Sequence, residues 1–154
     1  MQARLTKRFI VENIDNLELS KPIRYERYYI NDNLRIQKKD EKFEKEVLNE
    51  NNVLINKEEI SKKEFNELKK EAYKTIIRDS YLYKKDSRIS IKKYYEDYEG
   101  LNRVEVKFTN QEELENYQKE SWMGKEITVS PLAFDKYLSK LNKEEFLEEL
   151  KKVT

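Results

Sequence analysis

The stretch Leu5-Thr6-Lys7-Arg8-Phe9-Ile10-Val11 has a period of two in its side chains. In an extended chain alternate side chains point to opposite faces, so this stretch presents two separate faces. The mostly apolar face carries Leu5, Lys7, Phe9 and Val11, and the opposite face carries Arg4, Thr6, Arg8 and Ile10. This alternation predicts a half-buried β-strand at the start of the chain.

The same alternation recurs along the chain and predicts roughly eight strands in all. Leu34 and Ile36 alternate with Arg35 and Gln37 in one of them. The other runs are Ile23–Ile30, Glu41–Leu48, Val53–Lys57, Thr75–Tyr83, Arg88–Tyr95 and Asn102–Phe108. Residues 31–33 and 84–86 have the composition of hairpin turns.

Helix-capping residues mark the expected helices. A Ser or Asn stands three residues before a Glu in three places: Ser61 with Glu64, Asn110 with Glu113, and Asn142 with Glu145. Ser130 followed by Pro131 predicts another helix, with Phe134, Leu138 and Leu141 on its apolar side.

These elements predict an α+β fold in a single domain over residues 1–154, with a helical C-terminal part from about residue 130. Two architectures fit the alternation. One is an eight-stranded, mainly antiparallel β-barrel with a polar tunnel and peripheral helices. The other is an open sheet with one face in water.

Composition excludes several classes of chemistry. The chain has no Cys and no His, so disulfides, cysteine nucleophiles, histidine bases and the usual zinc sites are excluded. Only carboxylate-held ions such as Mg²⁺ or Mn²⁺ remain. The formal net charge is +1 although 41% of residues are charged, so any binding patch must come from local segregation of charge, and no duplex nucleic acid is expected as a partner. No apolar run is long enough to span a bilayer, so we expect a cytoplasmic protein without a membrane partner.

The C-terminal third carries a family resemblance. Val104-Glu105-Val106-Lys107-Phe108, then Gln111–Tyr117, then Trp122-Met123-Gly124-Lys125-Glu126-Ile127-Thr128 resemble the CYTH domain of the triphosphate tunnel metalloenzymes. Residues 5–11, 27–30 and 34–36 resemble earlier strands of that family. The resemblance implies an eight-stranded tunnel in which acidic residues hold divalent cations and basic residues hold a triphosphate. Class IV adenylyl cyclases, thiamine triphosphatases and inorganic triphosphatases have this fold.

The family's acidic positions are mostly replaced in this sequence. Arg4, Thr6, Lys92 and Lys107 stand where the resemblance places metal-holding acids. Glu105 is retained, and Glu59 is a looser match. One carboxylate holds a divalent cation weakly, and basic neighbours repel it further.

The substitutions lead to a binding hypothesis with three alternatives. We expect a catalytically degenerate domain that binds a phosphorylated anion (a nucleotide, a cyclic oligonucleotide or polyphosphate) without a cofactor. The expected ligand-binding residues are Arg4, Arg8, Arg35, Arg78, Lys92 and Lys107. The first alternative is a divergent triphosphatase or adenylyl cyclase that uses Mg²⁺ or Mn²⁺, with Glu105 as catalytic residue and Glu105 and Glu59 as metal ligands.

The second alternative is a tunnel without a ligand, whose basic residues form internal ion pairs with the glutamates of neighbouring strands. The third is an inhibitor or sequestering factor from a mobile element that binds a protein partner through the outside of the barrel. Composition and spacing leave the oligomeric state and the ligand open.

Overall fold

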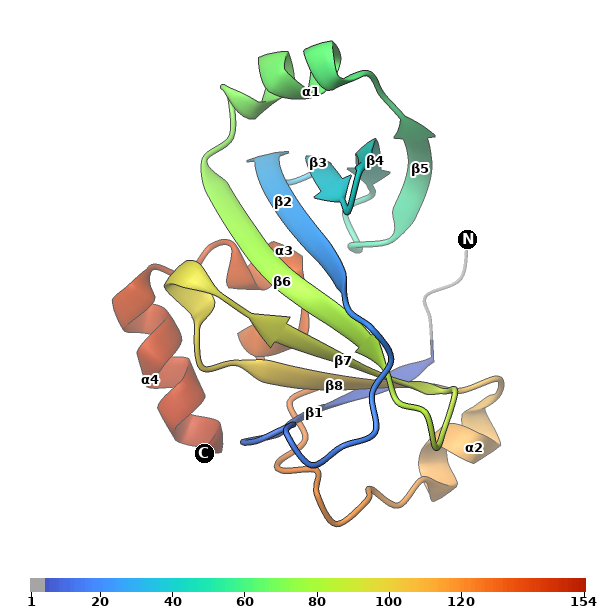
Figure 1. The fold of residues 1–154 in the computed structure, drawn as a ribbon. Helices are drawn as coiled ribbons and strands as arrows, with labels where there is room; N and C mark the ends of the chain where they lie inside the picture. The colour runs from blue at the N-terminus through green and yellow to red at the C-terminus, as the bar shows by residue number, and fades with distance from the viewer. Residues whose placement is uncertain (1–4) are drawn as a thin grey trace.

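The computed structural model describes residues 5–154, and Arg4, one of the expected ligand-binding residues, lies outside this range. Eight strands form one sheet (Figure 1). They are β1 Thr6–Ile10, β2 Ile23–Asn31, β3 Leu34–Lys39, β4 Lys42–Leu48, β5 Leu54–Glu59, β6 Lys74–Leu82, β7 Ile89–Tyr94 and β8 Asn102–Lys107.

The strands lie in the order β1-β8-β7-β6-β2-β3-β4-β5, and all neighbouring pairs are antiparallel. The sheet is strongly curled: β3, β4 and β5 bend over at the top of Figure 1, β2 and β6 run downward side by side, and β7, β8 and β1 fan out below. The expected eight-stranded antiparallel architecture is therefore confirmed. The closed barrel is not, because no pairing joins β1 to β5 within residues 5–154.

The free edge of β1 is covered by a later segment of the chain instead of by β5. The Ile10 amide donates to the Lys125 carbonyl (3.0 Å), and the Ile127 amide donates to the Arg8 carbonyl (2.7 Å). Gly124 permits this close approach, since a Cβ at this position would lie 2.8 Å from the Ile10 carbonyl oxygen. The segment that resembles the CYTH motif thus completes one side of the curled sheet.

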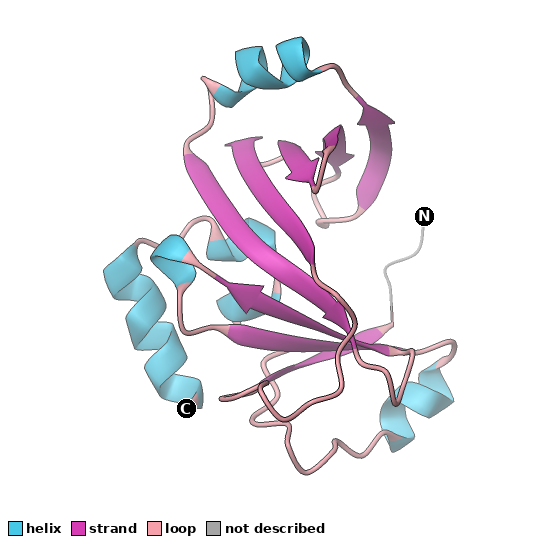
Figure 2. Cartoon of the chain, in the orientation of Figure 1, coloured by secondary structure: helices cyan, strands magenta, loops and turns pink. Residues whose placement is uncertain are grey.

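The helices lie around the sheet (Figure 2). Helix α1 (Lys62–Lys69) connects β5 to β6, and the Ser61 hydroxyl caps its N-terminus by accepting from the Glu64 amide. Helix α2 (Gln111–Asn116) follows β8, and α4 (Lys143–Val153) begins with a complete capping box between Asn142 and Glu145. None of the helices in residues 5–154 is long and apolar enough to cross a membrane.

The single helix expected after Ser130 is wrong. The chain forms a 3₁₀ turn, η2 (Pro131–Ala133), and then a four-residue helix, α3 (Asp135–Leu138). Ser130 caps only the 3₁₀ turn, and Phe134 between the two elements is extended, with φ −131° and ψ 135°. The break places Asp135 at the start of α3, where its carboxylate contacts arginines on the strands of the sheet.

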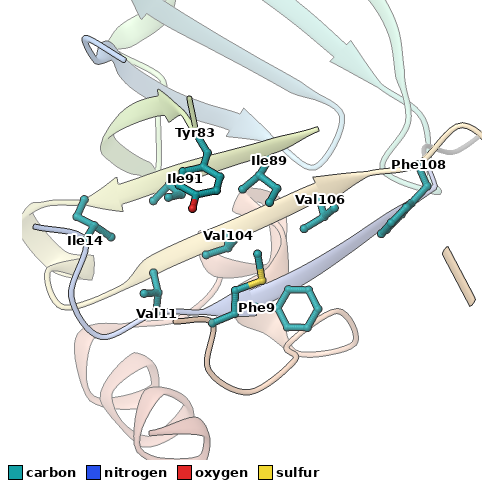
Figure 3. Packing of buried hydrophobic residues seen from close by; sticks show 10 residues of the cluster. Phe9, Val11, Ile14, Tyr83, Ile89, Ile91, Val104, Val106 and Phe108 are labelled. Carbon is teal, nitrogen blue, oxygen red and sulfur yellow. The ribbon is translucent and has the colours of Figure 1, made fainter. Parts of the chain in front are cut away.

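Apolar residues cover both ends of the structure. One cluster packs on the outer face of β1, β8 and β7; it includes Phe9, Val11, Ile89, Ile91, Val104 and Val106 (Figure 3). A second cluster joins the sheet to the C-terminal helices through residues such as Ile76, Leu132, Leu138 and Phe146. The third lies beneath α1 and contains Tyr28, Ile36 and Phe65. Because apolar residues occupy the outer face of β1, β8 and β7, the alternate residues of these strands face the inside of the curl.

Candidate functional site

The inside of the curl carries charged side chains, and we call this surface the tunnel face. Arg27 of β2 and Arg103 of β8 are separated by β6 and β7 in the sheet, yet both guanidinium groups reach the same carboxylate, that of Asp135. Side chains this far apart along a sheet can converge only on its concave side.

Glu105 is the centre of one ionic cluster on the tunnel face. Its carboxylate lies 3.8 Å from Arg8 Nε, 4.0 Å from Lys92 Nζ and 2.9 Å from Arg103 Nη2. Burial alone would raise the pKa of Glu105, but Lys92, Arg103 and Arg8 lower it below its ordinary value. Glu105 is therefore a buried, ionised carboxylate surrounded by cations.

A second ionic cluster surrounds Asp135, which the sequence did not single out. Arg27 Nη1 lies 2.8 Å from Asp135 Oδ2, Arg78 Nε lies 3.0 Å from the same oxygen, and Arg103 Nη2 lies 3.2 Å from Oδ1. The Tyr94 hydroxyl donates a hydrogen bond to Oδ1 as well. The Asp135 side chain is only 1% exposed. Burial would raise its pKa, yet the three arginines hold that pKa well below its ordinary value.

The expected ligand-binding residues fall into different places. Arg8, Arg78 and Lys92 lie together around these two clusters. Lys107 follows Glu105 by two residues on β8, is exposed, and acts on the charge of Lys92. Arg35 lies elsewhere: its Nε is 2.7 Å from Glu46 on β4.

The tunnel face therefore has two halves of different charge. In the half formed by β3, β4 and β5, Arg35 and Lys57 are balanced by Glu44 and Glu46. In the half formed by β1, β8, β7, β6 and β2, six basic side chains face two carboxylates, Asp135 and Glu105, and one of the six, Arg27, also lies 4.0 Å from Glu46 of the other half. These six are Arg8, Arg27, Arg78, Lys92, Arg103 and Lys107. We call this second part the basic half.

Lys92 is a largely buried cation of the basic half whose pKa is lowered. Burial, together with repulsion from Arg78 and Arg103, lowers the pKa of Lys92 to about 7, although Glu105 acts in the opposite direction. A lysine in this state gains from a nearby anion, because the anion stabilises its charged form.

Arg8 has unused hydrogen-bonding capacity. Its Nη1 donates to the Thr6 hydroxyl (2.6 Å), while its buried Nε has no hydrogen-bond partner within residues 5–154. The guanidinium carbon lies 4.2 Å from the centre of the Phe134 ring. An arginine that is buried and only partly satisfied is suited to accept an anionic ligand.

The carboxylates of the tunnel face do not fit a divalent cation. No group of three or more Asp and Glu residues lies close enough to hold a metal ion in the part of the chain that the structure describes. Glu105 and Asp135 each already face three cationic side chains. Glu59 is exposed on β5, where its register partner is Glu44.

Two of the missed residues had a signal in the sequence. Arg103 precedes Glu105 by two residues, so the period of two already places it on the same face of β8. Arg27 lies on β2, where the same period of two sets the face to which its side chain points. Asp135 had no comparable signal, since its position depends on the break at Phe134.

Solved structures share this fold. A crystal structure of the inorganic triphosphatase NE1496 superposes with a TM-score of 0.71 at 17% identity, covering 90% of this chain and 95% of that one. A structure described as the hypothetical protein NE1496 gives a TM-score of 0.74 at 16% identity, covering 91% and 99% of the two chains. No protein-family model and no curated protein matches the sequence. The structural likeness confirms the tunnel fold that the CYTH resemblance implied.

Proposed function

We propose that the basic half of the tunnel face binds a phosphorylated anion without a divalent metal. The observation that carries this proposal is the charge balance, with six basic side chains facing two carboxylates inside the curl. The fold is also that of a protein named as an inorganic triphosphatase, which supports a scaffold suited to phosphate.

The chemistry of the basic half suits phosphate oxygens. Arg8 offers a planar guanidinium whose Nε makes no hydrogen bond within residues 5–154, and guanidinium groups hold phosphate through two parallel hydrogen bonds. Lys92 and Lys107 act as point charges, and the Thr6 and Ser90 hydroxyls add donors close to Arg8 and Lys92. A bound phosphate would neutralise the excess positive charge and stabilise protonated Lys92.

The same features argue against metal-dependent hydrolysis. A metal acts on a phosphoryl group by polarising it or by generating a nucleophile from water, and it must first be held by free carboxylates. Glu105 and Asp135 are engaged by arginines, so a cation would have to displace these ion pairs. The proposed function is therefore recognition of the anion and not its cleavage.

Calorimetry at low ionic strength tests this proposal. Phosphate, pyrophosphate, tripolyphosphate, AMP, ATP and a cyclic dinucleotide are titrated into the protein, once with EDTA and once with Mg²⁺. We expect binding of at least one of them in EDTA, weakened by Lys92→Ala. Lys93→Ala is the matched control, because Lys93 is the next residue of β7 and points to the opposite face. Absence of binding to every compound, or binding that requires Mg²⁺, refutes the proposal.

A metal-dependent triphosphatase is the second candidate, favoured by the name of the structural neighbour. It predicts Mg²⁺- or Mn²⁺-dependent phosphate release from tripolyphosphate that Glu105→Gln abolishes. Release that is absent, or that persists in Glu105→Gln, removes this candidate.

A further inference from the structure

Both ionic clusters of the basic half contain a carboxylate of the chain, but Arg8 and Lys92 lie 3.8 Å and 4.0 Å from Glu105, beyond hydrogen-bond distance, whereas Asp135 accepts hydrogen bonds from three arginines. The Asp135 cluster, which we call the inner subsite, holds a carboxylate supplied by the chain itself. The outer subsite consists of Arg8, Lys92 and Lys107 with the Thr6 and Ser90 hydroxyls. Building on the proposed function, we propose that Asp135 permanently fills the inner subsite, so that the tunnel takes a single phosphate group and excludes a triphosphate chain.

The inner subsite has the donor arrangement of an oxyanion site. Asp135 Oδ2 accepts from Arg27 Nη1 (2.8 Å) and Arg78 Nε (3.0 Å), and Oδ1 accepts from Arg103 Nη2 (3.2 Å) and from the Tyr94 hydroxyl. These donors come from four different strands and point at one buried group. Arginine holds phosphate oxygens and carboxylate oxygens through the same kind of charge-assisted hydrogen bond, and here the carboxylate of Asp135 receives those bonds.

Most of the other hydrogen-bonding groups of the inner arginines are also in use. Arg103 donates through Nε to Glu105 and through Nη1 to the Leu132 carbonyl. Arg27 donates through Nε to the Gln37 side chain, and Arg78 donates through Nη1 to the Ser80 hydroxyl. A second phosphate that followed the first into the tunnel would have to displace Asp135.

Asp135 is held in place by its own element. Helix α3 is short, but the Ser139 amide donates to the Asp135 carbonyl (2.8 Å), and the neighbouring Leu132 and Leu138 side chains are fully buried. Displacing Asp135 would therefore also expose apolar surface. This anchorage makes Asp135 a fixed wall of the binding site.

The outer subsite has the capacity for one phosphate group. Arg8 Nε has no partner in residues 5–154, Lys92 Nζ makes one hydrogen bond (2.9 Å, to Ser90), and Lys107 is exposed. Thr6 pairs with Lys107 and Arg8 pairs with Glu105 in the register of β1 and β8. The available donors of Thr6, Lys107 and Arg8 therefore lie on the adjacent strands β1 and β8. Lys92 adds a further donor from β7, the next strand of the sheet.

A chain-length series tests this inference. Phosphate, pyrophosphate and tripolyphosphate are titrated calorimetrically into the wild-type protein in EDTA at constant ionic strength. We expect tripolyphosphate to bind less than about fivefold tighter than phosphate. In Asp135→Asn, we expect tripolyphosphate to gain about tenfold or more while phosphate changes little. Asp15→Asn, which removes one exposed carboxylate, should behave as the wild type.

Each outcome decides between the alternatives. Wild-type protein that binds tripolyphosphate more than about fivefold tighter than phosphate overturns the inference but leaves the proposed function standing. A folded Asp135→Asn variant that shows no preference for the longer chain also overturns it. If Asp135→Asn does not fold, the wild-type series decides alone. If no compound binds to the wild type, the proposed function itself fails.

Discussion

Replacing Asp135 by Asn is expected to destabilise the protein by about 3 kcal/mol. Removing one partner of a buried ion pair typically costs about 3–5 kcal/mol, because the remaining charge is left uncompensated. The Asp135 side chain is 1% exposed, so water cannot replace the lost carboxylate.

The structure favours the lower end of that range. Arg103 keeps Glu105 at 2.9 Å, and Arg27 keeps Glu46 at 4.0 Å, so each retains another carboxylate. Arg78 has no other carboxylate in contact within residues 5–154 and is left with the Ser80 hydroxyl. One guanidinium therefore becomes a largely uncompensated buried charge.

Urea unfolding followed by Trp122 fluorescence measures the change. With a denaturant slope of about 2 kcal/mol per molar, the midpoint should fall by about 1.5 M. Asp15→Asn should stay within about 0.5 kcal/mol of wild type, since Asp15 is exposed.

The stability that Asp135 contributes should also depend on pH. Because the folded pKa of Asp135 is depressed, its contribution is complete above its ordinary pKa near 3.8 and is lost as the pH falls further. A loss below about 1 kcal/mol would show that the Asp135 cluster does not carry the stability argued for it.

The remaining predictions concern three other positions. The pKa of Lys92 is lowered to about 7 in the folded state, so between that value and the ordinary 10.5 the unfolded state binds more protons than the folded state. The stability of the wild type should therefore rise with pH in this window relative to Lys92→Met. Urea midpoints at about pH 6 and about pH 9 check this, and an equal change of the midpoint with pH in both proteins would contradict it. Gly124→Ala should destabilise by about 1–3 kcal/mol in thermal unfolding, because the added Cβ would lie 2.8 Å from the Ile10 carbonyl oxygen; an unchanged midpoint would mean that the segment shifts freely. Arg35→Met should weaken stability, since it removes the ion pair with buried Glu46, yet leave phosphate affinity within about twofold in calorimetry; a large loss of affinity would place Arg35 in the binding site.

Much of the fold follows from local patterns in the sequence. The period of two at Leu5–Val11 and at Asn102–Phe108 places one set of side chains outside and the other inside, and β1 and β8 follow it. Side-chain alternation is a local property of extended chains, so a single sequence is enough to reveal it. The caps at Ser61 and Asn142 are equally local, and both helices begin where these residues predict.

The rest of the site depends on contacts between distant residues. Asp135 meets Arg27 across 108 residues of sequence, and no local pattern encodes that meeting. The Ser130-Pro131 signal predicts one helix, but the chain forms only a 3₁₀ turn there, and after the extended Phe134 a second short helix begins at Asp135. The same limit applies to the covering of the β1 edge, because the Gly124–Ile127 segment bonds to β1 from more than 110 residues away, as the 120-residue separation of Arg8 and Thr128 illustrates.

The Asp135 cluster also has a consequence for the order in which the chain folds during synthesis. Its arginines and its carboxylate come from β2, β6, β8 and α3, which span residues 27 to 135. Until Asp135 arrives, closing the sheet would bury guanidinium groups without their counter-charge, and contacts of such long range form slowly. A nascent chain whose Asp135 is still inside the ribosome should therefore remain open and protease-sensitive even after all eight strands have emerged. We therefore expect folding to be completed by the docking of Asp135 and not by the pairing of the last strands.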